Sequence, residues 1–274
     1  MNRKCSRTIC GAIVGDVVGS RFEFNNNKSK EFELFTLECD YTDDSVMTIA
    51  VAKSLMDYGP VTDYEDYKKK LVEVMHEVGK RYPHCGYGGN FCGWIMKDLT
   101  EPYNSYGNGS AMRVSPVGWV AGTLSEAEEL ARATAEVTHN HPEGIKGAQV
   151  VAGAIYLART GATKEDIRHY AETYYKLGFT LDEIRPTYDF IEICQESVPQ
   201  AIEAFLEADG FEDTIRNAIS IGGDSDTIAA IACSIAEAYY GVDEEIADTA
   251  LSFLDDYLLD ILIDFSKKLA DPPK

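Results

Sequence analysis

The chain has 274 residues, of which 45% are hydrophobic, and it carries 46 acidic against 25 basic side chains, a net charge of −21. A surface this acidic repels nucleic-acid phosphates and anionic lipid, so it excludes binders that rely on a basic footprint. No window of about 18 apolar residues is present, so we expect no membrane-spanning helix. The length suits one domain over residues 1–274 with a sizeable core, and we expect a monomer.

The seven cysteines are irregularly spaced and form no CxxC pair. An odd number without a regular pattern favours reduced thiols, and therefore a cytoplasmic protein. The cysteines are Cys5, Cys10, Cys39, Cys85, Cys92, Cys194 and Cys233.

The pattern along the chain is that of helices. Residues 8–22 place Gly11, Gly15 and Gly19 on one face, which predicts close contact with another helix. Residues 125–137 follow Ser125, with Glu128 three positions later, which predicts a capping box. The other expected helices are 43–59, 63–80, 143–160, 163–176, 198–208, 211–219, 226–240 and 244–270.

Signals for strands are sparse, because no alternation of apolar and polar residues persists over six positions. The least regular stretches are 24–41, 81–124 and 178–197. Loops of such length in a compact domain are usually functional or flexible. We therefore predict a single all-α domain, in which the stretches 24–41 and 81–124 flank the motifs described next.

Two clusters of carboxylates and hydroxyls stand at predicted helix starts, 180 positions apart. The first cluster is Thr42, Asp43 and Asp44; the second cluster is Asp224, Asp226 and Thr227. Helix capping explains one aspartate per helix but not four, since a helix start has few free N–H groups. Grouped carboxylates also repel one another, and a divalent cation removes that repulsion. The all-oxygen donor set favours Mg²⁺, Mn²⁺ or Ca²⁺ over zinc.

Two other readings of the second cluster fit poorly. An EF-hand loop beginning at Asp224 would need glycine and glutamate where Ala229 and Ile235 stand. A phosphatase of the DxDGT kind needs a buried strand before its first aspartate, whereas Gly222 and Gly223 precede Asp224 here.

Three further stretches offer candidate residues. Glu23 lies between two phenylalanines, which would raise its pKa and suit it to acid or base work, although a surface loop glutamate is the commoner case. The stretches 85–93 and 103–118 are rich in glycine, and their N–H groups could hold phosphate or simply form ordinary loops. In the second of them, the hydroxyls of Ser105 and Ser110 could assist, and its tyrosines could stack on a base.

His139 and His141 form a His-x-His pair just before a predicted helix. On a strand such a pair would suit zinc, but the proline that follows argues against a strand. Hydrogen bonding of one histidine to a ligand, and capping of the helix by a histidine, are both open alternatives.

Taken together and in order, these motifs resemble the ADP-ribosylglycohydrolase family over nearly the whole chain. The resemblance is carried by "GAIVGDVVGSRFEF", "YTDDS", "GNGSAMRVSPVG", "THNHPEG" and "GGDSDTIAAIACSIAEAYYG". It implies an all-α, orthogonally packed, multi-helix fold and a centre of two Mg²⁺ ions, with Mn²⁺ as the alternative ion. Both clusters would ligate the metal, with Asp226 as the shared ligand.

The resemblance also implies roles for individual residues. Glu23 would lie beside the substrate ribose, and the expected catalytic residues are Glu23, Asp44 and Asp226. The expected contacts to ADP-ribose are Gly88, Gly89, Asn90, Ser105, Tyr106, Gly107, Asn108 and His139. Asn90 stands where some family members have another glycine.

The function implied is hydrolysis of the bond that joins C1″ of ADP-ribose to a modified side chain. Arginine is the default target, and O-linked ADP-ribose, on serine or in a small ester such as O-acetyl-ADP-ribose, is the alternative. A non-catalytic member that only binds ADP-ribose, and an unrelated metal hydrolase or phosphatase acting on nucleotides, are further hypotheses.

Overall fold

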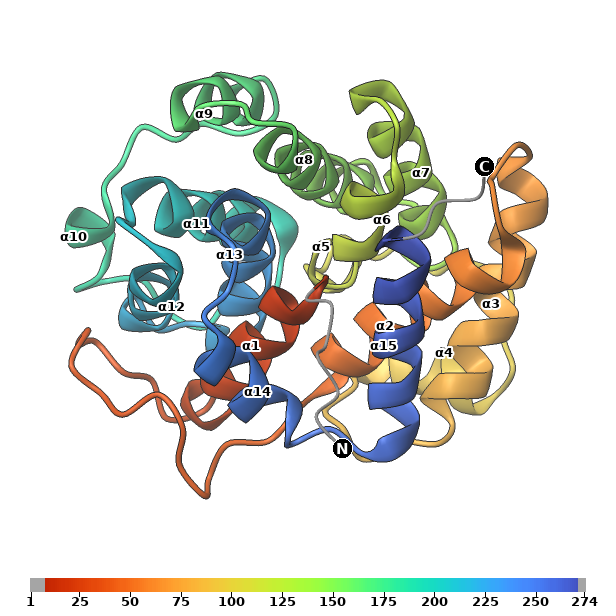
Figure 1. The fold of residues 1–274 in the computed structure, drawn as a ribbon, viewed down its shortest axis with the longest axis horizontal. Coiled ribbons are helices and arrows are strands. Elements are labelled where there is room, and N and C mark those ends of the chain that lie inside the picture. The colour runs from red at the N-terminus through yellow and green to blue at the C-terminus, as the bar shows by residue number, and fades with distance from the viewer. Residues whose placement is uncertain (1–7, 271–274) are drawn as a thin grey trace.

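The computed structural model describes residues 8–270, and in that range the chain forms fifteen α-helices and one short 3₁₀ helix, η1 (Figure 1). The elements are α1 (Cys10–Gly19), η1 (Ser20–Phe22), α2 (Asp43–Tyr58), α3 (Tyr64–Gly79), α4 (Gly89–Met96), α5 (Gly109–Met112), α6 (Ser115–Val120), α7 (Leu124–Glu136), α8 (Pro142–Arg159), α9 (Lys164–Glu172), α10 (Leu181–Ile184), α11 (Cys194–Glu207), α12 (Phe211–Ser220), α13 (Ser225–Tyr240), α14 (Glu244–Leu251) and α15 (Asp256–Ala270). Between residues 8 and 270, strand-like pairing is limited to one antiparallel bridge between Gly107 and Ile193. The all-α prediction is confirmed.

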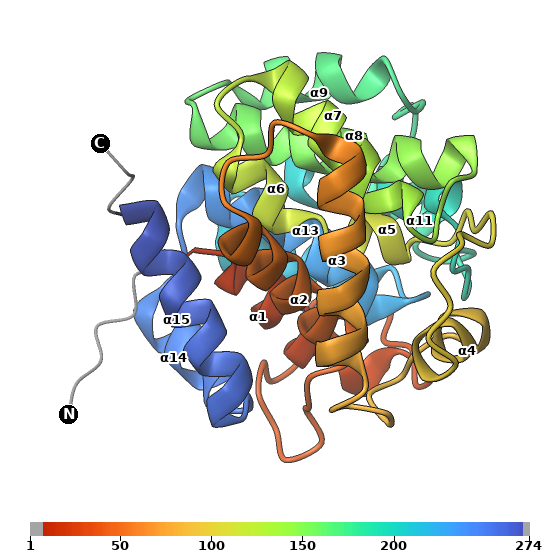
Figure 2. The same cartoon turned by 90° about the vertical axis from the view of Figure 1, so that its right-hand side faces the viewer.

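The interior of the molecule is built on α1 and α13. All ten residues of α1 are buried, and so are the residues of α13 from Ser225 to Glu237. Helices α7, α8 and α9 cover one side of this pair, while α14 and α15 flank another (Figure 2). No helix in the described part of the chain is long and apolar enough to cross a membrane.

The glycine face of α1 lies directly on the backbone of α13, as the sequence predicts. A Cβ added at Gly11 would lie 2.4 Å from the carbonyl oxygen of Cys233, and one added at Gly15 would lie 2.3 Å from that of Ala229. At Gly19 it would lie 2.5 Å from the Cα of Asp226. Only glycine permits this approach, because each of these neighbours is backbone.

A carboxylate of α13 caps the start of α1. Glu237 Oε2 accepts a hydrogen bond from the N–H of Gly11 at 2.8 Å, and Oε1 accepts from the N–H of Cys10 at 3.3 Å. Burial raises the pKa of Glu237 to about 7, and these donors act in the opposite direction. This contact fixes the register of α1 along α13, so that the end of α1 meets the start of α13.

Several element boundaries differ from those expected. The region 244–270 is two helices, because Asp255 Oδ1 accepts from the N–H of Leu258 at 2.9 Å and begins a new helix. The cap of α7 is Thr123, whose hydroxyl accepts from the N–H of Glu126, so the predicted Ser125 capping box is wrong. The stretches 81–124 and 178–197 contain short helices α4, α5, α6 and α10, whose few residues give little periodicity.

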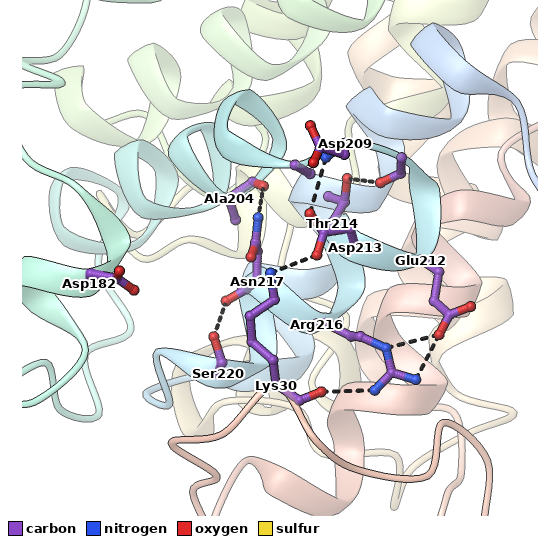
Figure 3. A network of polar contacts seen from close by, with 12 residues as sticks. Lys30, Asp182, Ala204, Asp209, Glu212, Asp213, Thr214, Arg216, Asn217 and Ser220 are labelled. Atoms are coloured by element: carbon purple, nitrogen blue, oxygen red, sulfur yellow. Dashed lines mark hydrogen bonds and ion pairs between the residues drawn. The ribbon is translucent and has the colours of Figure 1, made fainter.

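The segment 24–41 has no helix but is fastened to α12, as Figure 3 shows. Lys30 Nζ lies 2.6 Å from Asp213 Oδ1. Arg216 Nη1 donates to the carbonyl oxygens of Lys30 and Phe32, both at 2.9 Å. No disulfide bond joins the described cysteines to one another, and Cys5 lies outside the described residues.

The close contact of α1 with α13 gives a testable prediction. Gly15→Ala should lower the free energy of unfolding by 1–3 kcal/mol or more, because the added methyl meets backbone that cannot turn away. Thermal or urea unfolding measures this loss. The matched control is Gly93→Ala in α4, where a Cβ meets nothing within 4 Å and the better helix propensity of alanine should leave stability unchanged or slightly raised.

Candidate active site

A cavity of roughly 550 Å³ brings the predicted site residues together. All of them except Thr42 line it, although they come from segments spread between positions 23 and 227. Glu192 and Arg113 also line this cavity, although neither residue belongs to a motif that the sequence predicts to be functional. Arg113 lies in an apolar segment after the glycine-rich loop, and a charged residue in such a segment is the one feature of the sequence that could have indicated a functional role.

The first cluster begins α2. Thr42 is the N-cap, and its hydroxyl oxygen accepts from the N–H of Asp44 at 3.3 Å. Asp44 is only 3% exposed. Capping therefore employs the threonine and leaves the carboxylates of Asp43 and Asp44 for other contacts.

The second cluster begins α13, where Asp224 occupies the N-cap position. Gly222 and Gly223 have φ values of +71° and +79°, the left-handed region that glycine adopts without strain, and their turn delivers Asp224 to the cavity. Asp224 Oδ2 accepts from Asn108 Nδ2 at 2.7 Å. Thr227 Oγ1 donates to Asp44 Oδ2 at 3.1 Å, so the two clusters touch.

Asp16 is a buried carboxylate of the site that sequence analysis did not assign. It accepts from the N–H and hydroxyl of Thr42 at 2.9 and 2.7 Å, and from the N–H and hydroxyl of Ser45. Burial raises the pKa of Asp16 to about 6 despite these donors. In the sequence, Asp16 is a single charged residue in the apolar helix that carries the glycine face. Its hydrogen bonds to Thr42 and Ser45 hold the start of α2 in place.

The carboxylates form two overlapping groups in which one oxygen per residue lies within 4.8 Å of the others: Asp16, Asp44 and Asp226, and Glu23, Asp224 and Asp226. Within the described chain, Asp44 Oδ1 and Asp226 Oδ1 are buried without a hydrogen-bond partner. Burial, followed by the charges of neighbouring carboxylates, raises the pKa of Asp44 and Asp226 well above the usual range and that of Asp43 to about 8. An oxygen-seeking cation would satisfy these atoms and remove the repulsion, so the residues fit a metal.

Glu23 is half-buried at the wall of the same cavity. Burial raises its pKa to about 7, and the charges of Asp224 and Glu192 add to the effect. The chain just beyond Glu23 is clamped to the turn before Asp224, since Asn26 Oδ1 accepts from the N–H of Gly223 at 2.7 Å and Asn26 Nδ2 donates to its carbonyl oxygen at 3.0 Å. This pair of hydrogen bonds keeps Glu23 beside the second cluster.

The glycine-rich loops form the other side of the cavity. Gly88 precedes α4, so Gly89 and Asn90 present the first turn of that helix to the cavity. Ser105 Oγ accepts from the N–H of Gly107 at 3.2 Å. Ser110 does not face a ligand, because its hydroxyl donates to the carbonyl oxygen of Gly144.

The two histidines have different environments. His141 caps α8, because its Nδ1 accepts a hydrogen bond from the N–H of Glu143 at 3.1 Å. The ring of Tyr106 packs beside it, with the two ring centroids 5.1 Å apart. His139 is buried and lines the cavity. Neither belongs to a metal-type group among the described residues, so the ligand-contact and capping readings fit and the zinc pair does not.

An all-helical protein that holds clustered carboxylates at two helix N-termini, beside a third helix start that has no side-chain cap, has the construction of a metal-dependent hydrolase of phosphate-bearing substrates. Sequence comparison agrees with this class and makes it specific. A sequence profile of the ADP-ribosylglycohydrolase family matches residues 3–271, and the chain belongs to that family. It is therefore an enzyme of the glycosidic-bond hydrolase class.

Similar proteins include human ADP-ribosylhydrolase ARH3, which is 28% identical over 316 residues spanning 86% of this chain and 85% of that one. ADP-ribosylarginine hydrolase Tri1 of Pseudomonas putida is 26% identical over 85% of this chain and 70% of its own length. ADP-ribosyl-[dinitrogen reductase] glycohydrolase of Rhodospirillum rubrum is 27% identical over 74% and 70%. A solved structure described as an "ADP-ribosylglycohydrolase-related protein complex" has the same fold, with a TM-score of 0.65, 22% identity and coverage of 94% and 95%.

The orphaned carboxylate oxygens predict that a divalent cation stabilises the fold. Adding Mg²⁺ to metal-free protein at a hundredfold excess over Kd should raise the free energy of unfolding by about 2.7 kcal/mol. Asp226→Asn should abolish most of this shift while leaving the metal-free protein at least as stable, since it replaces a carboxyl group whose charged form is disfavoured by burial and by the neighbouring carboxylates. Differential scanning calorimetry measures both effects.

The control for that measurement is Asp248→Asn, on the exposed face of α14, which should respond to Mg²⁺ as the unmodified chain does. A melting temperature that moves with neither Mg²⁺ nor Mn²⁺ would contradict a metal site.

Proposed function

We propose that the protein is a Mg²⁺-dependent hydrolase that cleaves the bond between C1″ of ADP-ribose and a modified side chain, with arginine as the first target. The observation that carries this proposal is the cavity wall where Asp44 and Asp226 leave buried oxygens unpartnered and Glu23 stands next to them. The cavity wall also includes the start of α4, which has no side-chain cap and suits a diphosphate.

Two Mg²⁺ ions, or Mn²⁺ in their place, would be held by the first and second clusters with Asp226 as the shared ligand. Carboxylate and hydroxyl oxygens at helix N-termini are the donors that such hard cations prefer. When bound, the ions supply positive charge that orients the ribose diol and lowers the pKa of an attacking water.

The chain's own residues would perform the remaining tasks. The loop Ser105–Asn108, the start of α4 and His139 would hold the ADP-ribose moiety and leave C1″ at the carboxylate wall. Glu23 would exchange the proton in the displacement, since its pKa of about 7 permits both charge states near neutral pH. Water oxygen bonds to C1″, the C1″–nitrogen bond breaks, and one proton passes from the water to the departing guanidine.

Two observations favour arginine. The relative from Pseudomonas putida is named for ADP-ribosylarginine. The cavity wall beside Glu23 also includes the carboxylate of Glu192, which has no role in the metal site and interacts electrostatically with Glu23. Such a wall suits a cationic guanidinium more than a neutral hydroxyl.

The substrate prediction is tested by hydrolysis of peptides that carry ADP-ribose on arginine or on serine, with Mg²⁺ and with EDTA. We expect release of ADP-ribose with a higher kcat/KM from the arginine peptide, and loss of that activity in EDTA. Faster turnover of the serine peptide would reassign the target. Absence of turnover of any ADP-ribose linkage by the Mg²⁺-loaded protein would contradict the enzyme proposal.

The proton-transfer role predicts that Glu23→Gln lowers kcat by roughly 10²–10⁴-fold while binding of ADP-ribose stays within a few-fold of normal. Single-turnover kinetics and calorimetric titration measure the two quantities. Glu38→Gln is the matched control, because Glu38 is exposed in the segment that follows Glu23 and should leave both unchanged. If the unmodified protein and Glu23→Gln bind ADP-ribose equally and both are inactive, the protein is a binder and not an enzyme.

A further inference from the structure

Arg113 is a buried cation without an acidic partner in the described chain. Its side chain is 1% exposed, and its guanidinium makes no ion pair between residues 8 and 270. Nη2 donates to Thr138 Oγ1 at 2.8 Å and to the carbonyl oxygen of Thr134 at 3.3 Å, while Nε has no partner among these residues. Burying an unpaired charge is costly, so its position in the cavity wall points to an anion that arrives with the ligand.

Thr138 connects Arg113 to His139 through its hydroxyl group. The hydroxyl oxygen of Thr138 lies 2.7 Å from His139 Nδ1, within hydrogen-bonding distance. A guanidinium only donates, so Thr138 accepts from Arg113 with one lone pair, and its hydroxyl keeps one proton to donate and a second lone pair. Among the described residues no other acceptor for this proton is found, so we infer that Thr138 donates to Nδ1, which would leave Nδ1 unprotonated and place the imidazole hydrogen on Nε2.

Nε2 of His139 is on the side of the ring that faces the glycine-rich loop. A Cβ added at Gly109 would lie 3.3 Å from it, and one added at Gly107 would lie 3.7 Å from it. Burial, together with the charge of Arg113, lowers the pKa of His139 well below its usual value, so the ring is neutral at physiological pH. Nε2 is thus a neutral donor directed at the loop, and the positive charge stays on Arg113 behind it.

We propose that Arg113, Thr138 and His139 form a relay that fixes His139 as an Nε2–H donor to a phosphate oxygen of the substrate's diphosphate. Arg113 and Thr138 are positioning residues in this relay, and the charge of Arg113 adds attraction for the anion. The inference rests on the proposed function, because the diphosphate belongs to ADP-ribose. In a chain of net charge −21, this buried cation places a positive charge on the side of the cavity where His139 lies, away from the carboxylates.

The tautomer is tested directly by ¹⁵N NMR of the histidine rings in the unmodified protein. We expect His139 to show a protonated Nε2 and an unprotonated Nδ1 across the neutral range. Thr138→Val keeps the side-chain shape but removes the hydroxyl, and should give a mixture of tautomers. Thr138→Ser, which keeps the hydroxyl, should restore the single tautomer. A protonated Nδ1 or an imidazolium in the unmodified protein would overturn the relay, whatever the variants do.

Recognition of the diphosphate is tested by calorimetric titration with ADP-ribose and with adenosine, a neutral ligand that lacks the diphosphate. Thr138→Val should weaken ADP-ribose binding about tenfold and leave adenosine binding within twofold, while Thr138→Ser should bind ADP-ribose like the unmodified protein. Circular dichroism at the titration temperature confirms that each variant is folded.

The outcomes separate this inference from the proposed function. If Thr138→Val is folded and binds ADP-ribose as tightly as the unmodified protein, the relay does not serve the diphosphate, even though hydrolysis is intact. If the unmodified protein binds no ADP-ribose, the proposed function and the diphosphate assignment both fail, and the NMR spectrum still decides the tautomer.

Discussion

The contact between α1 and α13 governs the rest of the structure. Glycine at three turns of α1 lets two backbones meet without side chains between them, and the Glu237 cap fixes how far one helix slides along the other. Because the register is fixed, Gly19 at the end of α1 meets Asp226 at the start of α13. The segment that follows α1 then places Glu23 beside Asp226. The packing of α1 on α13 therefore determines the positions of the carboxylates in the site.

The cavity contains many more carboxylates than basic groups, and the two kinds of charge lie on different sides of it. Carboxylates from α1, α2 and α13 gather on one wall, where burial and mutual repulsion disfavour their charged forms. On the loop side, the charge of Arg113 stands behind His139. The proposed function would use this division, with the metal ions at the carboxylate wall and the phosphates of the substrate on the side of Arg113.

Much of this organisation was predictable from sequence, because it depends on residue types that local rules constrain. Glycines at helical spacing predicted the α1 contact, and repeated aspartates at two helix starts predicted facing clusters. The break at Asp255 was missed because apolar residues run through both helices with nearly the same spacing. Asp16 and Arg113 were missed for a different reason: a single charge in an apolar run acquires meaning only from partners far away in the chain.

Glu237 caps a helix that begins 227 residues earlier, at Cys10, and this separation bears on how the chain folds. During synthesis from the N-terminus, α1 and α2 are complete long before α13 leaves the ribosome. Until then the glycine face of α1 has no surface to cover it, and Asp44 has no Thr227 to contact. Contacts this distant in sequence slow folding and leave apolar surface exposed to chaperones or to aggregation. The contact that brings the two clusters together therefore forms only after α13 has been synthesised, late in the assembly of the molecule.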